Sequence, residues 1–289
     1  MAKRGPMSLN VPQWERTTWG DMLRIAGNPR EHFLRKYLFR RHLSRSPWSS
    51  ALPRSTGLSK LENFALPGTR EVVDYCRRLL EERIAQGFEK KKDKKPYRQT
   101  IAGSEDLLSN ELISRYILST PILAIAAGYL SQIPLLQEIE LWRSRPHGDW
   151  SGSQFYHQDG IDKRQAKFFL FVKDVTTEDG PVTLLPAPES RRLRAILGYR
   201  GGRLKDNVVF KHVDKASEVA LTGKAGDLAL ADTSRCLHFG SRCQSGERWT
   251  LMFHFTTHLA GEKRNSDPAA LPHEYQDDPV RRLVLSTSL

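Results

Sequence analysis

The chain has 289 residues, of which 39% are hydrophobic and 27% are charged, so it is long and apolar enough to bury a core of its own. Its formal net charge of +12 favours an anionic partner without identifying one. No stretch approaches the roughly 18 uninterrupted apolar residues that a membrane helix needs, and the basic first residues lack the apolar segment of a secretory signal. The three cysteines, Cys76, Cys236 and Cys243, give no disulfide framework and fit a reducing cytoplasm.

The first hundred residues are predicted to be mostly helical and to form an extension, residues 1–104, that packs on the core. Asn28 and Pro29 are typical of a helix start, with asparagine as the cap and proline in the first turn. Residues 69–87 have the spacing of a second amphipathic helix. The lysine-rich run at 90–95 is interpreted as a solvated loop, with contact to an anionic substrate as the alternative.

After this extension the pattern changes from helices to short strands. Residues 105–116 and the segment that begins at Thr120 are still predicted to be helical. The segments after Pro134 are rich in β-branched and aromatic residues and are separated by Gly, Pro and Asp, as strands are. They are LLQEIELWRS, QFYHQD, AKFFLFVKDV, PVTLLP, DLALAD and RWTLMFHFTTH. Such strands predict a sandwich or jelly-roll core over 105–260, followed by a weakly structured tail or edge cover at 261–289.

The stretch SQFYHQDGID places His157 and Asp159 two residues apart. Side chains at positions i and i+2 of a strand point to the same face. One imidazole and one carboxylate in this relation supply two ligands of a 2-His-1-carboxylate triad, which holds Fe(II) and leaves positions open for substrate and O₂. The third ligand should be a later histidine on another strand. His238 is the candidate, because it lies where an apolar strand ends before Gly240.

The strand that begins at Arg248 strengthens this candidate site. Its alternation places Arg248, Thr250, Met252 and His254 on one face, whereas the other face is continuously apolar. An arginine that faces the interior needs an anionic partner, because a buried guanidinium must be paired. A carboxylate is the natural partner, since it can accept two parallel hydrogen bonds from the guanidinium.

Four pieces, HQDG, EDGPVTLLP, GDLALADTSRCLHFG and Arg248, resemble in order and spacing the Fe(II)/2-oxoglutarate dioxygenases, in particular the phytanoyl-CoA dioxygenase-like family. The likeness covers about residues 105–258. It implies a mainly β fold with helices, built on a double-stranded β-helix of the jelly-roll or cupin-like kind. It also implies an iron ion held by His157, Asp159 and His238.

The resemblance further implies that 2-oxoglutarate is the cosubstrate and that Arg248 pairs with its far carboxylate. Thr250 is expected to add a hydrogen bond, and Phe169 stands where the family places a bulky residue against the cosubstrate. The implied reaction uses O₂, releases succinate and CO₂, and hydroxylates or otherwise oxidises an unactivated C–H bond of a small or medium metabolite, with ascorbate as a supporting reductant. The presence of Asp159 disfavours the halogenating relatives, which have a small residue there.

Other interpretations stay open at this point. Arg242, four residues past His238, is a rival for the cosubstrate carboxylate. Cys236, His238 and Cys243 suggest zinc, but they lack a convincing fourth ligand. The fold could also serve as a binding or regulatory module without turnover. A nucleic-acid-directed dioxygenase is disfavoured, because such enzymes carry a second arginine well beyond the one at Arg248, and LMFHFTTHLAGEKR contains no clear match.

The substrate side departs from the family pattern, because APESRRL follows LLP where members usually have Gly-Ser-His. Arginines gather between this segment and the distal histidine, namely Arg191, Arg192, Arg194, Arg200 and Arg203. They favour an acidic metabolite that bears a carboxylate or a phosphate, and a merely solvated surface is the alternative. The sequence indicates no membrane partner and leaves the oligomeric state undetermined.

Overall fold

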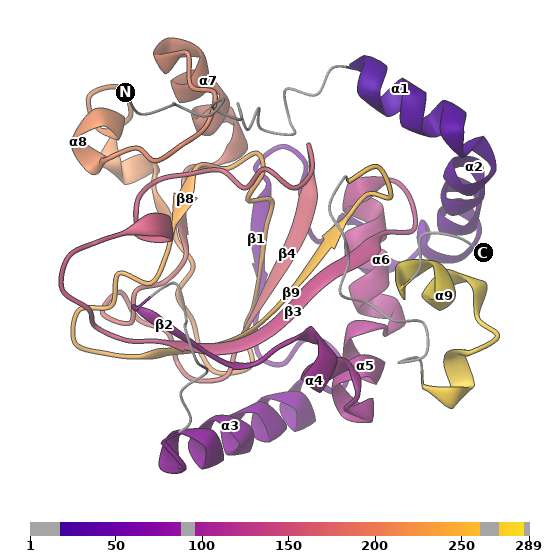
Figure 1. The fold of residues 1–289 in the computed structure, drawn as a ribbon, viewed down its shortest axis with the longest axis horizontal. Helices are drawn as coiled ribbons and strands as arrows, with labels where there is room; N and C mark the ends of the chain where they lie inside the picture. Colours follow the sequence, from indigo (N-terminus) through magenta and orange to yellow (C-terminus); the bar gives the residue numbers. More distant parts are fainter. Residues whose placement is uncertain (1–17, 88–95, 261–271, 286–289) are drawn as a thin grey trace, which may run out of the picture.

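The computed structural model describes residues 18–87, 96–260 and 272–285. Its strands are β1 (Leu58–Leu61), β2 (Arg98–Ala102), β3 (Leu135–Ser144), β4 (Gln165–Phe171), β5 (Thr183–Leu184), β6 (Val219–Ala220), β7 (Leu228–Ala231), β8 (His238–Phe239) and β9 (Arg248–Thr256). They form two antiparallel sheets (Figure 1). The larger sheet has the order β1-β7-β4-β9-β3-β2, and the smaller has the order β6-β5-β8.

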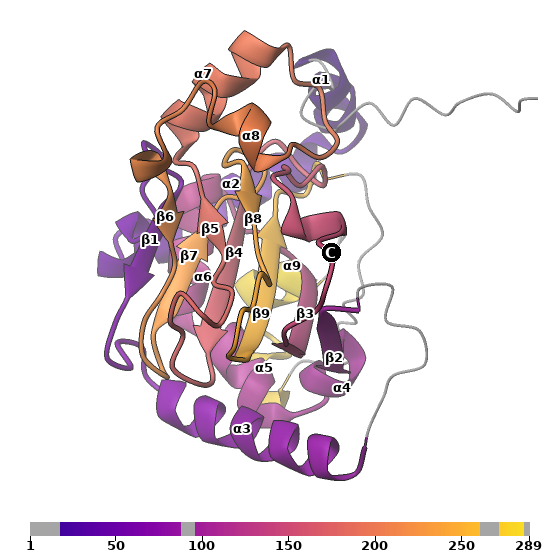
Figure 2. The same cartoon turned by 90° about the vertical axis from the view of Figure 1, so that its left-hand side faces the viewer.

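Helices surround this pair of sheets. The α-helices are α1 (Thr18–Gly27), α2 (Pro29–Leu38), α3 (Thr69–Ala85), α4 (Ser104–Leu108), α5 (Glu111–Ile117), α6 (Thr120–Leu130), α7 (Ala187–Leu197), α8 (Asp206–Val209) and α9 (Pro279–Leu285). Short 3₁₀ turns occur at Pro47–Ser50, Gly152–Gln154, Lys215–Ser217 and His273–Tyr275, and α2 continues into a π-helical turn at Phe39–Leu43. Figure 2 shows α7 and α8 beside the smaller sheet, whereas α5, α6 and α9 lie behind the larger one.

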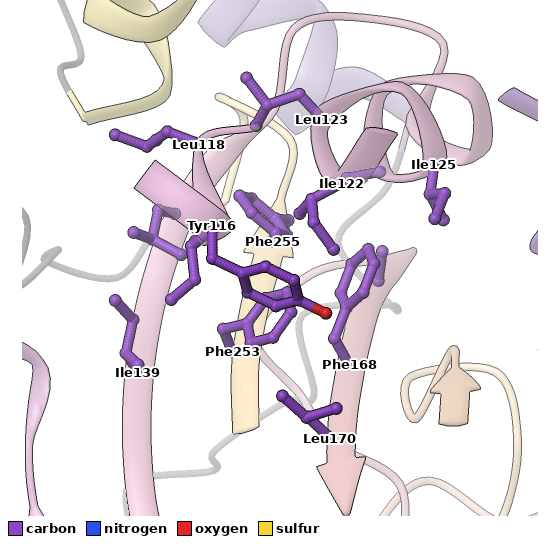
Figure 3. Close-up of a cluster of buried hydrophobic side chains, with 14 of the residues drawn as sticks. Tyr116, Leu118, Ile122, Leu123, Ile125, Ile139, Phe168, Leu170, Phe253 and Phe255 are labelled. Carbon is purple, nitrogen blue, oxygen red and sulfur yellow. The ribbon is translucent and has the colours of Figure 1, made fainter. Parts of the chain in front are cut away.

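Three apolar clusters fill the spaces between these layers. The first lies between the larger sheet and its helices, where Tyr116 and Ile122 pack near Phe168 and Phe253 (Figure 3). The rings of Phe168 and Phe253 stack with their centroids 4.7 Å apart. The second cluster lies between the sheets and includes Phe169, and the third lies between the smaller sheet and α7. This arrangement of antiparallel sheets confirms the predicted jelly-roll core, although helices occupy more of the described chain than strands do, so the fold is mixed rather than mainly β.

The alternation of β9 explains how one strand serves two of these layers. Leu251 and Phe253 belong to the helix-facing cluster, whereas Met252 belongs to the cluster between the sheets. Arg248 and His254 share the parity of Met252 and are buried. The predicted division of this strand into an apolar face and a mixed, site-facing face is therefore confirmed.

The first hundred residues contain the predicted helices together with strands that were not predicted. Asn28 caps α2, because its side-chain oxygen accepts a hydrogen bond from the N–H of Glu31 at 3.2 Å. The helix predicted at 69–87 is present as α3. However, β1 and β2 join the two edges of the larger sheet, so the expectation of a mostly helical segment is incomplete. The lysine-rich run at 90–95 lies outside the described residues.

Two further predictions differ from the structure. The helix predicted at 105–116 is divided into α4 and α5, because Asn110 caps a new helix by accepting from the N–H of Ile113 at 3.2 Å. QFYHQD does not form a continuous strand: Tyr156 pairs with Leu204, and His157 pairs with His238, each as an isolated bridge.

The described part of the predicted tail contains a 3₁₀ turn and the helix α9, which packs on the core. Leu283 and Val284 of α9 are fully buried. The buried guanidinium of Arg35 donates to the carbonyl oxygen of Leu283 at 2.9 Å, and it also forms an ion pair with Glu31 at 2.7 Å. This part of the chain therefore belongs to the folded body and is more than a weakly structured tail.

No single helix within the described ranges has the length and apolar character to cross a membrane. Helices α5 and α6 meet those criteria only as a pair bent by 41°. Most residues of α6 are buried within the first apolar cluster.

Candidate functional site

His157, Asp159 and His238 converge between the two sheets. Their potential ligand atoms all lie within 4.8 Å of one another, and they are the one such cluster found in the described part of the chain. His157 Nε2 lies 3.8 Å from Asp159 Oδ1, and His238 Nε2 lies 3.9 Å from Asp159 Oδ2. Since metal–ligand bonds of about 2.1 Å allow two ligands of one ion to lie up to ~4 Å apart, a single ion could contact all three residues.

Backbone hydrogen bonds bring these distant parts of the sequence together. The N–H of His157 donates to the carbonyl oxygen of His238, and the N–H of His238 donates to that of His157, each at 2.9 Å. The N–H of Asp159 donates to the carbonyl oxygen of Thr233 at 3.0 Å. His238 itself belongs to β8, where it pairs with Leu184 of the smaller sheet. The backbone therefore fixes all three side chains relative to one another.

Both imidazoles have the tautomer and the neutral charge state that a metal ligand requires. His157 Nδ1 lies 2.9 Å from the carbonyl oxygen of Phe155, and His238 Nδ1 lies 3.1 Å from that of Cys236. A carbonyl oxygen can only accept, so each Nδ1 carries the proton and each Nε2 keeps a free lone pair. Burial lowers the pKa of His238 and lowers that of His157 well below its usual value, which keeps both rings neutral.

Asp159 is surrounded by donors. Its Oδ2 accepts from Lys167 Nζ at 2.6 Å, from Thr233 Oγ1 at 2.6 Å and from Gln165 Nε2 at 3.2 Å. Burial alone would raise the pKa of Asp159, but the Lys167 ammonium, the two neighbouring imidazoles and the hydrogen bond from Lys167 together outweigh this effect, so the pKa lies well below its usual value. The carboxylate is therefore ionised, and these three donors act on a single oxygen.

Arg248 lies on the same inner face, at the start of β9. It is 3% exposed, and its Nη2 donates to Ser241 Oγ at 3.1 Å. Its Nε has no hydrogen-bond partner, and no carboxylate of the described ranges forms an ion pair with it. Burial lowers the pKa of the guanidinium to about 10, so it stays charged near neutral pH. A buried, charged and incompletely paired guanidinium indicates a site for an anion.

Other polar atoms on this inner face also have no partner among the described residues. They are Thr250 Oγ1, Trp142 Nε1 and both ring nitrogens of His254. Thr250 pairs in register with Trp142 of β3, so both orphaned donors lie two residue pairs along from Arg248. Phe169 is buried between the sheets, opposite Met252. The structure thus places Arg248, Thr250 and Phe169 on the inner face of the larger sheet, whereas His238 of the triad belongs to the smaller sheet.

Arg242, the alternative residue for the cosubstrate carboxylate, extends toward Asp206. Ser241 adopts a left-handed φ of 60°, and the Arg242 side chain extends to Asp206, with which it forms two hydrogen bonds at 2.7 and 2.8 Å. Its guanidinium also lies over the rings of Phe239 and Trp150. Since Phe239 follows His238 in a strand, the two side chains point to opposite faces. Arg242 is therefore engaged on the face of the smaller sheet opposite to the His238 side chain.

The zinc interpretation is also not supported by the geometry. Cys236 is buried and lies 3.5 Å from the carbonyl oxygen of Thr56. Cys243 lies 3.1 Å from the carbonyl oxygen of Asp179. Neither cysteine joins the cluster of potential ligand atoms around His238.

Sequence reasoning missed the residues that hold Asp159, above all Lys167 and Gln165. A signal was present, because QAKFF alternates so that Gln165 and Lys167 share the face of Phe169. What the sequence does not reveal is the register that brings this face against Asp159. Thr233 lies in the loop after β7 and carries no local signal at all.

No protein-family model matches the sequence, and no curated protein matches it. Several solved structures are similar in fold. One is the epimerase SnoN in complex with Fe3+, alpha ketoglutarate and nogalamycin RO; it is 16% identical, the match covers 78% of this chain and 89% of that one, and the TM-score is 0.52.

EctD from S. alaskensis is similar to a like degree. The structure with bound Fe is 14% identical, with 76% of this chain and 79% of that chain covered and a TM-score of 0.53. The structure with 2-oxoglutarate and 5-hydroxyectoine is 14% identical, with 75% and 78% covered and a TM-score of 0.52.

At these identities the likeness establishes the fold. The triad of His157, Asp159 and His238 adds a second point of agreement with a non-haem iron site. The narrower resemblance to the phytanoyl-CoA dioxygenase-like family stays a prediction. The chain therefore has the fold of the non-haem iron, 2-oxoglutarate-dependent enzymes.

Proposed function

We propose that the protein is an Fe(II)- and 2-oxoglutarate-dependent dioxygenase that oxidises an unactivated C–H bond of a small or medium, acidic metabolite. His157, Asp159 and His238 would hold the iron, and Arg248 with Thr250 would hold the far carboxylate of the cosubstrate. The fold shared with SnoN and EctD, whose structures contain iron and 2-oxoglutarate or alpha ketoglutarate, supports this proposal.

One observation carries the proposal further than the fold does. The buried Arg248 has no carboxylate partner among the described residues, although a guanidinium in that position needs one. The orphaned hydroxyl of Thr250 lies on the same face of the same strand. A dicarboxylate that extends from the triad to this pair would satisfy both groups.

The residues fit the chemistry that the proposal assigns to them. Iron bound with 2-oxoglutarate and O₂ would supply the oxidant, with release of succinate and CO₂ and with ascorbate as a supporting reductant. The neutral imidazoles present their Nε2 lone pairs, and the ionised Asp159 supplies the one negative charge of the ligand set. Phe169 and Met252, both buried, would exclude water from this space.

Anaerobic titration tests the proposal directly. Addition of Fe(II) and 2-oxoglutarate should produce the visible charge-transfer band of the chelate, and exposure to air should release succinate. The D159A variant should lose both the band and succinate formation. Unchanged succinate formation in D159A would reject the assignment of the triad.

A binding or regulatory module of the same fold is the second candidate. Such a module would show the charge-transfer band but would form no succinate, with or without a substrate. A metabolite screen scored by substrate-stimulated succinate release separates the two candidates and would also identify the substrate.

Of the arginines predicted to contact the substrate, Arg203 is the best supported. Its charge contributes to the lowered pKa values of His157 and His238, and its Nε donates to the carbonyl oxygen of Gly152 at 2.8 Å. Arg191, by contrast, lies exposed on α7. If the substrate is anionic, R203E should raise its KM and R191E should leave it unchanged. Equal KM values in both variants would remove Arg203 from the substrate site.

We retain the cytoplasm as the proposed location and a small molecule as the proposed partner. All three cysteines are free, which agrees with a reducing compartment. No step of this proposal involves nucleic acid or a membrane.

A further inference from the structure

His254 is a fully buried polar group that the proposed function leaves without a role. The residue is 0% exposed, and neither of its ring nitrogens has a hydrogen-bond partner in the described part of the chain. It lies on the inner face of β9, the face that also carries Arg248 and Thr250. A buried polar group without a partner costs stability in the free protein, so its position indicates a ligand atom that completes it.

Lys167 lies beside His254. The two residues pair in register across β4 and β9, and the Lys167 side chain is 15% exposed. Its Nζ donates to Asp159 Oδ2 at 2.6 Å. An ammonium group has three N–H donors, and Asp159 accepts one of them. Lys167 and His254 therefore present a cation and an imidazole to the interior next to the triad.

We propose that Lys167 and His254 form a second anion subsite, beside the triad, that receives the carboxylate which a 2-oxo acid presents to the triad. This inference rests on the proposed function. It places a cation at each end of the cosubstrate: Arg248 at the far carboxylate and Lys167 at the near one. Asp159 can still serve as the iron ligand in this arrangement. Its three donors from the described residues all act on Oδ2, which leaves Oδ1 for the ion.

The inner face of β9 orders the two subsites along the strand. Thr250 and Met252 lie between Arg248 and His254, and Met252 is opposite Phe169. The wall thus reads as a polar end, an apolar middle and a second polar end. This order of polar and apolar side chains suits a dicarboxylate with a short aliphatic chain. Each end of the cosubstrate then has its own set of donors.

Oxalate is the probe that isolates the near subsite, because it chelates a metal but is too short to reach Arg248. The experiment uses the Co(II)-substituted full chain, whose visible spectrum reports whether the metal is bound, and calorimetric titration with oxalate and with 2-oxoglutarate. The variants are K167M and H254L. K173M is the matched control, because Lys173 is an exposed lysine just beyond the end of the same strand.

We expect K167M and H254L to bind Co(II) and to weaken oxalate binding by roughly tenfold or more, since each removes a hydrogen bond to a charged group. R248M should weaken 2-oxoglutarate binding and leave oxalate binding unchanged. K173M should change neither affinity. K167R, which keeps the charge, should recover part of the loss in K167M.

H254L also separates a ligand-binding role from a structural one. Because the imidazole makes no hydrogen bond within the described protein, its replacement by an apolar side chain should leave the thermal midpoint unchanged or raise it. A lowered midpoint with unchanged oxalate affinity would mean that His254 serves packing, and it would overturn the inference.

The two proposals fail in distinguishable ways. If wild type, K167M and H254L all bind Co(II), oxalate and 2-oxoglutarate equally well, the near subsite is disproved while the proposed function stands. If wild type binds neither Co(II) nor 2-oxoglutarate, the proposed function fails, and the subsite fails with it.

Discussion

His157 and His238 exchange both of their backbone hydrogen bonds, each at 2.9 Å, and their ring centroids lie 4.2 Å apart. Residues paired in this way lie directly opposite each other in an antiparallel bridge, with their side chains on the same side. Two of the three proposed ligands are therefore held together by the main chain. Loss of one imidazole should remove a ligand without displacing the other.

The H238A variant tests whether the backbone bridge persists when the imidazole ligand is removed. Because the bridge is made by backbone atoms, the variant should fold with a thermal midpoint close to that of the wild type. Its affinity for Co(II) should fall by about a hundredfold or more, since one of three ligands is lost. Calorimetry with Co(II) measures the change. H42A is the control, because His42 is exposed and distant from the triad in sequence; an equal loss in H42A would contradict the assignment.

Arg248 and Arg242 can be compared directly. R248M should retain Co(II) binding but weaken 2-oxoglutarate binding by roughly ten- to a hundredfold, because hydrogen bonds between charged groups contribute about 1.5–3 kcal/mol. R242M should leave that affinity unchanged, because Arg242 pairs with Asp206 on the other side of the smaller sheet. The reverse result would restore Arg242 as the residue that binds the cosubstrate.

The buried histidines predict how stability depends on pH. Burial lowers the pKa of His254 well below its usual value of 6.5. Below about pH 6.5 the unfolded chain takes up a proton at this residue while the folded chain does not. The free energy of unfolding should therefore be highest above this pH and should fall as the pH falls.

Urea unfolding at several pH values measures this dependence. H254L should show a shallower loss between pH 6.5 and the folded-state pKa, by up to about 1.4 kcal/mol per pH unit, which is the linkage of one proton. Burial also lowers the pKa values of His157 and His238. Part of the pH dependence of the free energy of unfolding should therefore persist in H254L. A slope identical to that of the wild type would show that His254 is accessible to protons in the folded state.

The aromatic cluster of Figure 3 predicts a large difference between two phenylalanines. Phe253 is fully buried and stacks on Phe168, whereas Phe33 on α2 is 65% exposed. F253A should lower the free energy of unfolding by about 3–5 kcal/mol, and F33A should change it by about 0.5 kcal/mol or less. Denaturant titration of both variants provides the comparison.

Local patterns predicted the parts of the site that depend on local geometry. The two-residue period of a strand was enough to place Arg248 and Thr250 on the inner face of β9, and the spacing of His157 and Asp159 indicated two ligands of one site. The resemblance of these motifs, in order and spacing, to the 2-oxoglutarate dioxygenases then implied the fold.

Long-range pairing decided the rest. Tyr156 and His157 form single bridges to distant residues instead of a regular strand. No local pattern in the sequence distinguishes an isolated bridge from a strand. The role of Lys167 depends on the packing of β4 against the loop that carries Asp159. The direction of Arg242 depends on the left-handed turn at Ser241, a residue whose type does not predict such a turn.

The order of the larger sheet has a practical consequence for anyone who wishes to produce the catalytic part alone. Its two outermost strands, β1 and β2, both come from the proposed extension at 1–104. A fragment limited to 105–260 would expose the unpaired backbone edges of β7 and β3, which are templates for intermolecular strand pairing. We therefore expect such a fragment to aggregate, and the shortest fragment suitable for expression should begin ahead of residue 58.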